Sequence, residues 1–171
     1  MAQARPGILT RIAVVALAAL LASCFGGKPV APPAAPPPSA TRLKATIDVA
    51  DSVNPDARGR PSPIVVKVYE LKAPTTFNGA DFFSLFERDR ETLGGDLVAV
   101  EEIQLLPGEK RAYERVLQAG TRNFGVLAAF RAVETAQWRA TLPIEANRSN
   151  RVLIKLEGTR CTISVVPDPS N

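Results

Sequence analysis

The sequence predicts an all-β sandwich of about eight short strands in two sheets, with a short helical insertion. From residue 41 onward, most segments alternate apolar and polar residues, which is typical of strands with one buried and one solvated face. Turn sequences such as Leu106-Pro107-Gly108-Glu109 and Ala146-Asn147-Arg148-Ser149 separate these segments. One segment near residue 80 has helical spacing instead.

Four segments show the alternation most clearly. Their apolar faces consist of Leu43, Ala45, Ile47 and Val49; of Trp138, Ala140, Leu142 and Ile144; of Val152, Ile154 and Leu156; and of Cys161, Ile163 and Val165. Two further runs, 63–71 and 123–133, are apolar on both faces, which indicates strands at the centre of a sheet. Residues 97–105 and 111–117 predict weaker strands, and the charges of the second favour a position at a sheet edge.

The segment 77–92 predicts the helical insertion. Asp81 is a suitable N-cap residue, and Gly94-Gly95 supplies a stop. The apolar residues of one helical face are Phe82, Leu85 and Phe86. We expect this helix to cover an open end or face of the sandwich; the alternative is a functional aromatic groove.

Residues 1–23 predict a secretory signal peptide. Arg5 and Arg11 give it a positive start, and residues 12–22 form an unbroken apolar run. As a helix this run would be about 16 Å long, which is too short for a bilayer core of about 30 Å. Removing the two arginines from the net charge of +4 leaves +2 for the exported part. This charge is too balanced for a nucleic-acid-binding protein.

The end of the signal, Leu21-Ala22-Ser23-Cys24, resembles the bacterial lipobox. The resemblance implies that the Cys24 thiol carries S-diacylglycerol and that the new amino terminus is N-acylated, for example with palmitate. Two or three acyl chains give lasting attachment to a membrane. Because Phe25 rather than Asp follows the cysteine, the sorting rules of such lipoproteins favour the outer membrane. The alternative is an ordinary signal peptide with an accidental cysteine.

Residues 24–40 predict a lipidated cysteine followed by a proline-rich tether. Six of the ten residues from Pro29 to Pro38 are proline, which excludes a helix or a central strand. Such a segment rises about 3.1 Å per residue, so it could lift a domain by up to about 50 Å. A ligand for an SH3-like groove is the alternative. Residues 41–171 then form the sandwich domain.

The sequence contains no histidine, which excludes Ser-His-Asp and Cys-His catalysis and imidazole metal sites. We therefore expect no catalytic residue, metal or cofactor apart from the lipid. Glu101 and Glu102 are adjacent on a strand, so they point to opposite faces and cannot share a site directly. Cys161 is left unpaired if Cys24 is acylated, and a buried thiol is expected, with intermolecular pairing as the alternative.

Several strings of residues together resemble the TssJ (VasD/SciN) family of type VI secretion lipoproteins. In order, they are 62–72, Phe77, 80–85, Leu93-Gly94, Leu106-Pro107-Gly108, 124–131 and Trp138-Arg139. The resemblance covers about residues 51–156 and implies a transthyretin-like fold with a helical insertion. It also implies a non-enzymatic role in the periplasm. The lipoprotein would bind the periplasmic domain of the inner-membrane subunit TssM and fix that subunit to the outer membrane.

The family makes this contact through a loop between its first two strands. The counterpart here comprises Asp51, Ser52, Val53, Asn54, Pro55, Asp56, Ala57, Arg58, Gly59, Arg60 and Pro61. Its prolines, glycine and charges suit an exposed recognition loop, although a polar connection with no binding role would look similar.

Two other functions remain open. A lipid-anchored ligand- or glycan-binding sandwich would need an exposed aromatic residue such as Trp138 or Tyr113, although a core position is expected for Trp138. A periplasmic hydrolase using carboxylates alone would need two converging acids.

Overall fold

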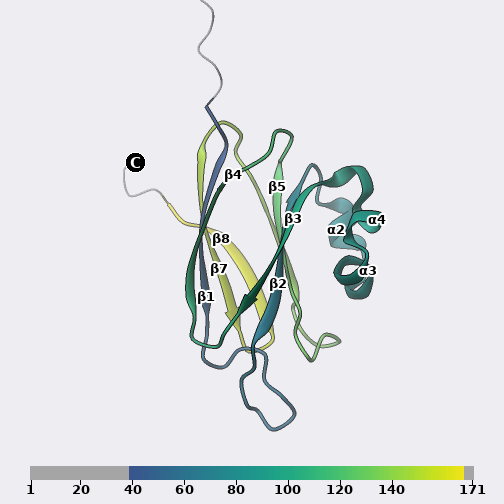
Figure 1. Ribbon diagram of the computed structural model, residues 1–171, viewed down its shortest axis with the longest axis vertical. Coiled ribbons are helices and arrows are strands. Elements are labelled where there is room, and N and C mark those ends of the chain that lie inside the picture. The colour runs from purple at the N-terminus through teal and green to yellow at the C-terminus, as the bar shows by residue number, and fades with distance from the viewer. Residues whose placement is uncertain (1–38, 168–171) are drawn as a thin grey trace, which may run out of the picture. The chain divides into compact units, whose positions relative to one another are not determined.

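Two four-stranded sheets pack face to face in the computed structural model, which describes residues 39–167 (Figure 1). The first sheet has the order β4-β1-β7-β8 and the second the order β3-β2-β5-β6. The strands are β1 (Arg42–Val49), β2 (Ile64–Leu71), β3 (Leu97–Leu105), β4 (Lys110–Val116), β5 (Asn123–Ala128), β6 (Arg139–Pro143), β7 (Ser149–Glu157) and β8 (Arg160–Val165). The predicted all-β sandwich is confirmed. The predicted signal peptide, Cys24 and residues 25–38 of the tether lie outside the described residues.

The alternation in the sequence becomes the core between the sheets. In β1, the four predicted apolar residues are all buried, whereas Arg42, Lys44 and Thr46 face solvent. β1 pairs with β4 in the antiparallel sense and with β7 in the parallel sense, so Ala45 lies opposite both Tyr113 and Val152. Each pairing places a buried residue beside a buried one, and the register is fixed by this match.

The two sheets confirm two predicted strand positions and correct one boundary. β2 lies between β3 and β5, as its doubly apolar sequence predicts, and β4 is an edge strand of the first sheet. The predicted strand 123–133 is wrong beyond Ala128, where the chain turns and the Phe130 amide donates to the Ala128 carbonyl at 3.0 Å. Phe130 is nevertheless buried. Its apolar character therefore reflects packing of a turn into the core.

Three short helices cover the outer face of the second sheet (Figure 1). They are α2 (Thr75–Gly79), α3 (Phe82–Glu87) and α4 (Asp89–Leu93), and the 3-10 turn Gly94–Asp96 follows them. Buried Phe77, Leu85 and Leu93 of this layer pack against Tyr69, Leu71 and Leu127 of the sheet. The expectation that the insertion covers a face of the sandwich is confirmed.

The expectation of one helix is wrong, because two breaks divide the insertion. Ala80 is extended, and Asp81 begins a new helix by accepting a hydrogen bond from the Ser84 amide at 3.0 Å. Arg88 leaves the helical conformation and ends α3. Gly94 ends α4 with φ +47°, as its predicted role as a stop requires. Among the described residues, no helix is long and apolar enough to cross a membrane.

Cys161 lies in the core between the sheets and is fully buried, as predicted. Burial disfavours the thiolate and raises the pKa of this thiol to about 12. The pKa of this thiol in the folded chain lies above its value of about 8.5 in the unfolded chain. The contribution of Cys161 to the free energy of unfolding is therefore fully present below about pH 8.5. It is lost as the pH rises toward the folded-state pKa, because the unfolded chain ionises first.

We therefore expect the thiol of Cys161 to resist an aromatic disulfide reagent at about pH 8 in the folded protein, since the thiolate is the reacting species. The same reagent should label it rapidly once urea unfolds the chain. Fast labelling of the folded Cys24→Ser variant, in which Cys161 is the one remaining cysteine, would contradict the burial.

Candidate functional site

The connection between β1 and β2 crosses from one sheet to the other and projects beyond the strand ends (Figure 1). It contains the predicted recognition loop, residues 51–61. The chain enters β1 from Ser39–Thr41 at the opposite end of the sandwich (Figure 1). β1 has eight residues and therefore separates the two ends by about 26 Å.

The base of this loop is anchored in the domain. Val53 is fully buried, and Asn54 is nearly so. The Asn54 side chain donates to the Pro63 carbonyl and accepts from the Arg131 amide, both at 2.8 Å, while its own amide donates to the Gly158 carbonyl at 2.8 Å. These bonds hold Asn54 at φ +50°, a conformation that asparagine tolerates better than most residues. Val53 and Asn54 are therefore buried members of the predicted exposed loop, and they position its other residues.

The tip of the loop is organised around Asp56. Its carboxylate accepts hydrogen bonds from the Arg58 amide at 2.8 Å and the Arg60 amide at 2.9 Å. The Arg60 guanidinium also pairs with it, at 2.7 Å from Nη2. Hydrogen bonds from Arg60, followed by the one from Arg58, hold the pKa of Asp56 below its usual range. Gly59 closes the turn at φ +77°, where a side chain would be strained.

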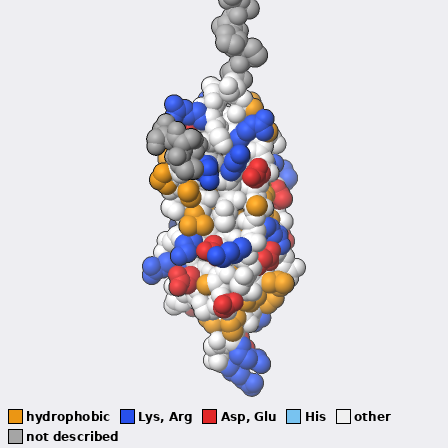
Figure 2. Space-filling model, turned by 90° about the vertical axis from the view of Figure 1, so that its left-hand side faces the viewer, with side chains coloured by type: hydrophobic (Ala, Val, Ile, Leu, Met, Phe, Trp, Pro, Cys, Tyr) orange, Lys and Arg blue, Asp and Glu red, His pale blue; other side chains and the backbone are white. Residues whose placement is uncertain are grey.

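This arrangement gives the two arginines different roles. The Arg60 guanidinium forms an ion pair with Asp56, whereas no contact of the Arg58 guanidinium is found among residues 39–167. Both side chains are exposed at the tip, and basic side chains mark the lower end of the molecule in Figure 2. Arg58 is therefore available to a carboxylate of a partner, and Arg60 maintains the shape that presents it.

Three other connections lie at the same end of the sandwich as the 51–61 loop. They are residues 106–109, 129–138 and 158–159. The Val49 amide donates to the Glu109 carbonyl at 2.9 Å, and Leu106 is exposed. Sequence reasoning missed the contribution of residues 129–138 because their apolar residues continue the pattern of β5. The charges at Arg131 and Glu134 are the signal that could have indicated a surface connection.

A buried carboxylate links the two sheets near β3 and β4. Glu70 has an exposed fraction of 1%, and its Oε2 accepts from the Gln118 amide at 2.7 Å and from the Thr121 hydroxyl at 2.8 Å. Arg115 Nε lies 3.2 Å from Glu70 Oε1, outside hydrogen-bond geometry, so the contact is an ion pair. The Arg115 guanidinium also pairs with Glu101 at 3.1 Å. Sequence reasoning missed Glu70, whose signal is a single acid in the apolar run 63–71.

Arg115 is expected to stabilise the fold through this contact. Arg115→Met would leave the Glu70 carboxylate buried without its counter-charge, and we expect a loss of about 3 kcal/mol in the free energy of unfolding. Arg111→Met on the same strand is the matched control. Its guanidinium pairs with Glu109 near the surface, so its loss should cost less than about 1 kcal/mol. Equal losses for the two variants in urea titrations would contradict the role of Arg115.

The two aromatic residues required by a glycan-binding function do not form an exposed platform. Trp138 is half-buried. The Phe82 ring packs edge-on against it, with the two ring centroids 5.3 Å apart, and the Arg139 guanidinium lies 4.5 Å from the Trp138 ring centroid. Tyr113 is buried, its hydroxyl donates to Glu101 at 2.9 Å, and burial raises its pKa to about 12. The core position predicted for Trp138 is thus only partly correct, since it bridges the core and the helical layer.

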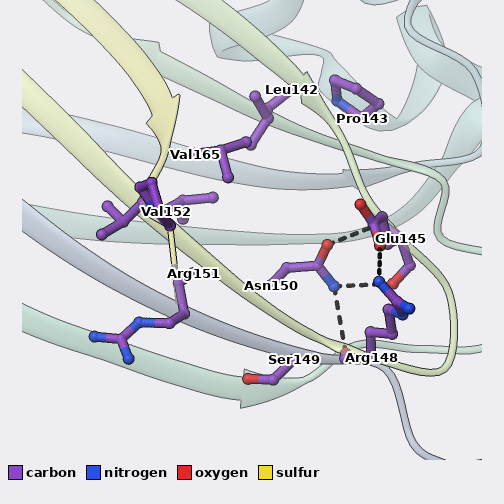
Figure 3. A pocket seen from close by; sticks show the side chains of 11 residues that line it. Leu142, Pro143, Glu145, Arg148, Ser149, Asn150, Arg151, Val152 and Val165 are labelled. Atoms are coloured by element: carbon purple, nitrogen blue, oxygen red, sulfur yellow. Dashed lines mark hydrogen bonds and ion pairs between the residues drawn. The ribbon is translucent and has the colours of Figure 1, made fainter. Parts of the chain in front are cut away.

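A pocket of about 540 Å³ lies between β6, β7 and β8, on the side of the sandwich away from β3 and β4, and its lining residues are drawn in Figure 3. Asn150 organises its rim by donating to the Glu145 carbonyl at 2.9 Å and accepting from the Glu145 amide at 2.8 Å. Glu145 is the only acid among the lining residues, and Arg148 pairs with it at 3.0 Å. The two converging acids that a carboxylate hydrolase needs are not found in this pocket. Residues 39–167 also contain no cluster of metal-ligating side chains.

Comparison with known proteins identifies relatives over the whole domain. The family model described as "Type VI secretion lipoprotein, VasD, EvfM, TssJ, VC_A0113" matches residues 41–159. The type VI secretion lipoprotein TssJ1 from Pseudomonas aeruginosa is 38% identical, with a TM-score of 0.74, over 76% of this chain and 99% of that chain. A search of curated proteins gave no significant match.

Two further solved structures contain similar chains. A chain of a type VI membrane complex is 30% identical, with a TM-score of 0.63, over 75% of this chain and 100% of that chain. A chain in the structure of the TssM C-terminal domain from EAEC is 27% identical, with a TM-score of 0.59, over 75% of this chain and 99% of that chain.

Proposed function

The chain belongs to the type VI secretion lipoprotein family, and we propose that it fixes a TssM-like inner-membrane protein to the outer membrane. In this proposal, lipid on Cys24 holds the protein at the periplasmic face of the outer membrane. The 51–61 loop binds the periplasmic domain of the partner. The role is structural and requires no catalytic step.

The observation that supports the proposal is that residues 39–41 enter the sandwich at one end and the 51–61 loop lies at the other (Figure 1). The chain from the lipobox enters at one end, and the loop tip with Arg58 lies at the other. A domain held by its amino-terminal end can therefore present the loop away from the membrane. The similar chains in a type VI membrane complex and in a TssM structure support this choice of partner.

Membrane fractionation tests the proposal directly. A tagged full-length chain is produced together with a TssM-like protein, and inner and outer membranes are separated by density. We expect the chain in the outer-membrane fraction, and we expect the partner to co-purify with it after solubilisation in detergent. Recovery of the chain in the inner membrane, or of the chain without the partner, would contradict the proposal.

A further inference from the structure

Residues 39–41 enter the sandwich between two loops, 117–122 and 144–148. The Thr41 carbonyl accepts from the Leu117 amide, and its hydroxyl accepts from the Asn147 amide, both at 2.9 Å. Residues 39–41 and both loops line a shallow pocket of about 310 Å³. Residues 39–41 are therefore held in place by the two loops at this end of the domain.

Basic side chains surround this point. We name as the basic collar five exposed residues at this end of the sandwich: Arg42, Lys44, Lys72, Arg122 and Arg148. Their elements adjoin, because the Arg42 amide donates to the Arg148 carbonyl and the Arg122 amide donates to the Leu71 carbonyl, both at 2.9 Å. Figure 2 shows several basic side chains at this end of the molecule, among others over the middle and the opposite end.

Acids lie beside three members of the collar. Glu114 lies opposite Lys44 across the β1–β4 pair, and Glu145 pairs with Arg148 at 3.0 Å. The Asp96 carbonyl accepts from the Lys72 amide at 2.8 Å, while the Asp96 carboxylate accepts from the Thr76 hydroxyl at 2.7 Å. Arg42 and Lys72 have no ion-pair partner within residues 39–167, and Arg122 contacts only the neighbouring Thr121 carbonyl through its side chain. By contrast, the helical segment carries four acids against two arginines between residues 81 and 91. Basic side chains without an ion-pair partner therefore lie where the chain leaves the domain, and the opposite end also carries exposed basic residues, Arg58, Arg131 and Arg160.

We propose that the basic collar docks on the anionic phospholipid headgroups of the leaflet in which Cys24 is anchored. This inference rests on the proposed lipid anchor, because the described chain enters the domain through residues 39–41, beside the collar. A basic residue close to an anionic membrane strengthens binding about fivefold, and the effect extends over about 8 Å at physiological salt. The proline-rich tether, with a reach of about 50 Å, keeps the collar near the surface so that weak attraction suffices.

Docking would set the orientation of the domain. With the collar on the headgroups, the strands run away from the membrane surface, and the 51–61 loop at their far end points into the periplasm. The lipid alone, on a tether of this length, leaves the orientation free. The collar therefore supplies the direction in which the loop is presented.

Vesicle binding by the unacylated exported chain carrying Cys24→Ser tests this inference. The probes are vesicles of phosphatidylcholine alone and vesicles in which part of it is replaced by phosphatidylglycerol. We expect binding to the anionic vesicles to be stronger by at least about tenfold and to weaken as salt is raised. The triple variant Arg42→Gln, Lys72→Gln, Arg122→Gln should lose on the order of 100-fold, or all measurable preference.

The matched control removes the same charge from the opposite end, through Arg58→Gln, Arg131→Gln and Arg160→Gln. This control should retain most of the preference for anionic vesicles, and circular dichroism should show that both triple variants are folded. Equal binding to the two vesicle types, or equal losses in the two variants, would overturn the inference. Sedimentation with peptidoglycan but not with vesicles would also overturn it, in favour of a cell-wall ligand. Because this chain carries no lipid, the outcome is independent of whether wild-type Cys24 is acylated.

Discussion

Cys24→Ser is expected to release the protein from the membrane and to stop secretion by the apparatus, while the sandwich remains folded. In the proposed anchor the Cys24 thiol is the one that is acylated, and serine cannot form the thioether. Two or three acyl chains would account for lasting attachment, whereas the proposed collar alone would give reversible binding. Fractionation should therefore move the protein almost completely from the membrane to the soluble periplasmic fraction.

The second cysteine provides the matched control. Cys161→Ser changes a buried thiol in the core and leaves the lipobox intact, so the protein should remain in the membrane fraction. Circular dichroism of both variants separates loss of the anchor from loss of the fold. Mass spectrometry of the wild-type protein provides the decisive check, and a Cys24 without lipid would contradict the anchor.

Charge reversal at the loop tip by Arg58→Glu and Arg60→Glu is expected to weaken binding to the periplasmic domain of the TssM-like protein by about 10- to 100-fold. The magnitude follows because the two substitutions place negative charges where the partner is expected to offer carboxylates. Arg58→Glu alone tests the contact, because the Arg58 guanidinium holds no other part of the loop. Arg60→Glu acts differently, since it places a carboxylate beside Asp56 and disrupts the tip.

A comparable change elsewhere on the surface separates this contact from a general effect of charge. Arg88→Glu with Arg90→Glu reverses two exposed arginines on the helical layer. In calorimetric titrations, this variant should bind the partner as the wild-type chain does. An unchanged affinity for the Arg58→Glu variant would remove the loop tip from the interface.

The strands could be predicted because the alternation of apolar and polar residues within one segment shows which of its side chains are buried, whatever its neighbours in the sheet. β1 shows this most clearly, since each apolar residue in its pattern is buried in the core. The extent of β5 was not predictable in this way, because Phe130 is buried by a turn and not by a strand. The number of helices depended on Ala80 and Arg88, whose backbone conformations have no signal in a hydrophobic pattern.

The candidate site could be predicted only in part, because it is assembled from distant segments. The polar composition of residues 51–61 indicates a loop, but it does not show that Asn54 is tied to Arg131 and Gly158. The collar likewise brings together Arg42, Lys72 and Arg122, which are far apart in the sequence. Such sets follow from the order of strands in the two sheets, and no local pattern reports that order.

Hydrogen–deuterium exchange of the complex with the TssM-like periplasmic domain would show both whether the chain binds this domain and which residues make the contact. We expect binding to slow exchange in residues 51–61 and in the neighbouring connections 106–109 and 129–138. Exchange in the helical layer and around residues 39–41 should stay as it is in the free chain. Unchanged exchange in residues 51–61, or slowing confined to the helices or to residues 39–41, would show that this loop does not bind the partner.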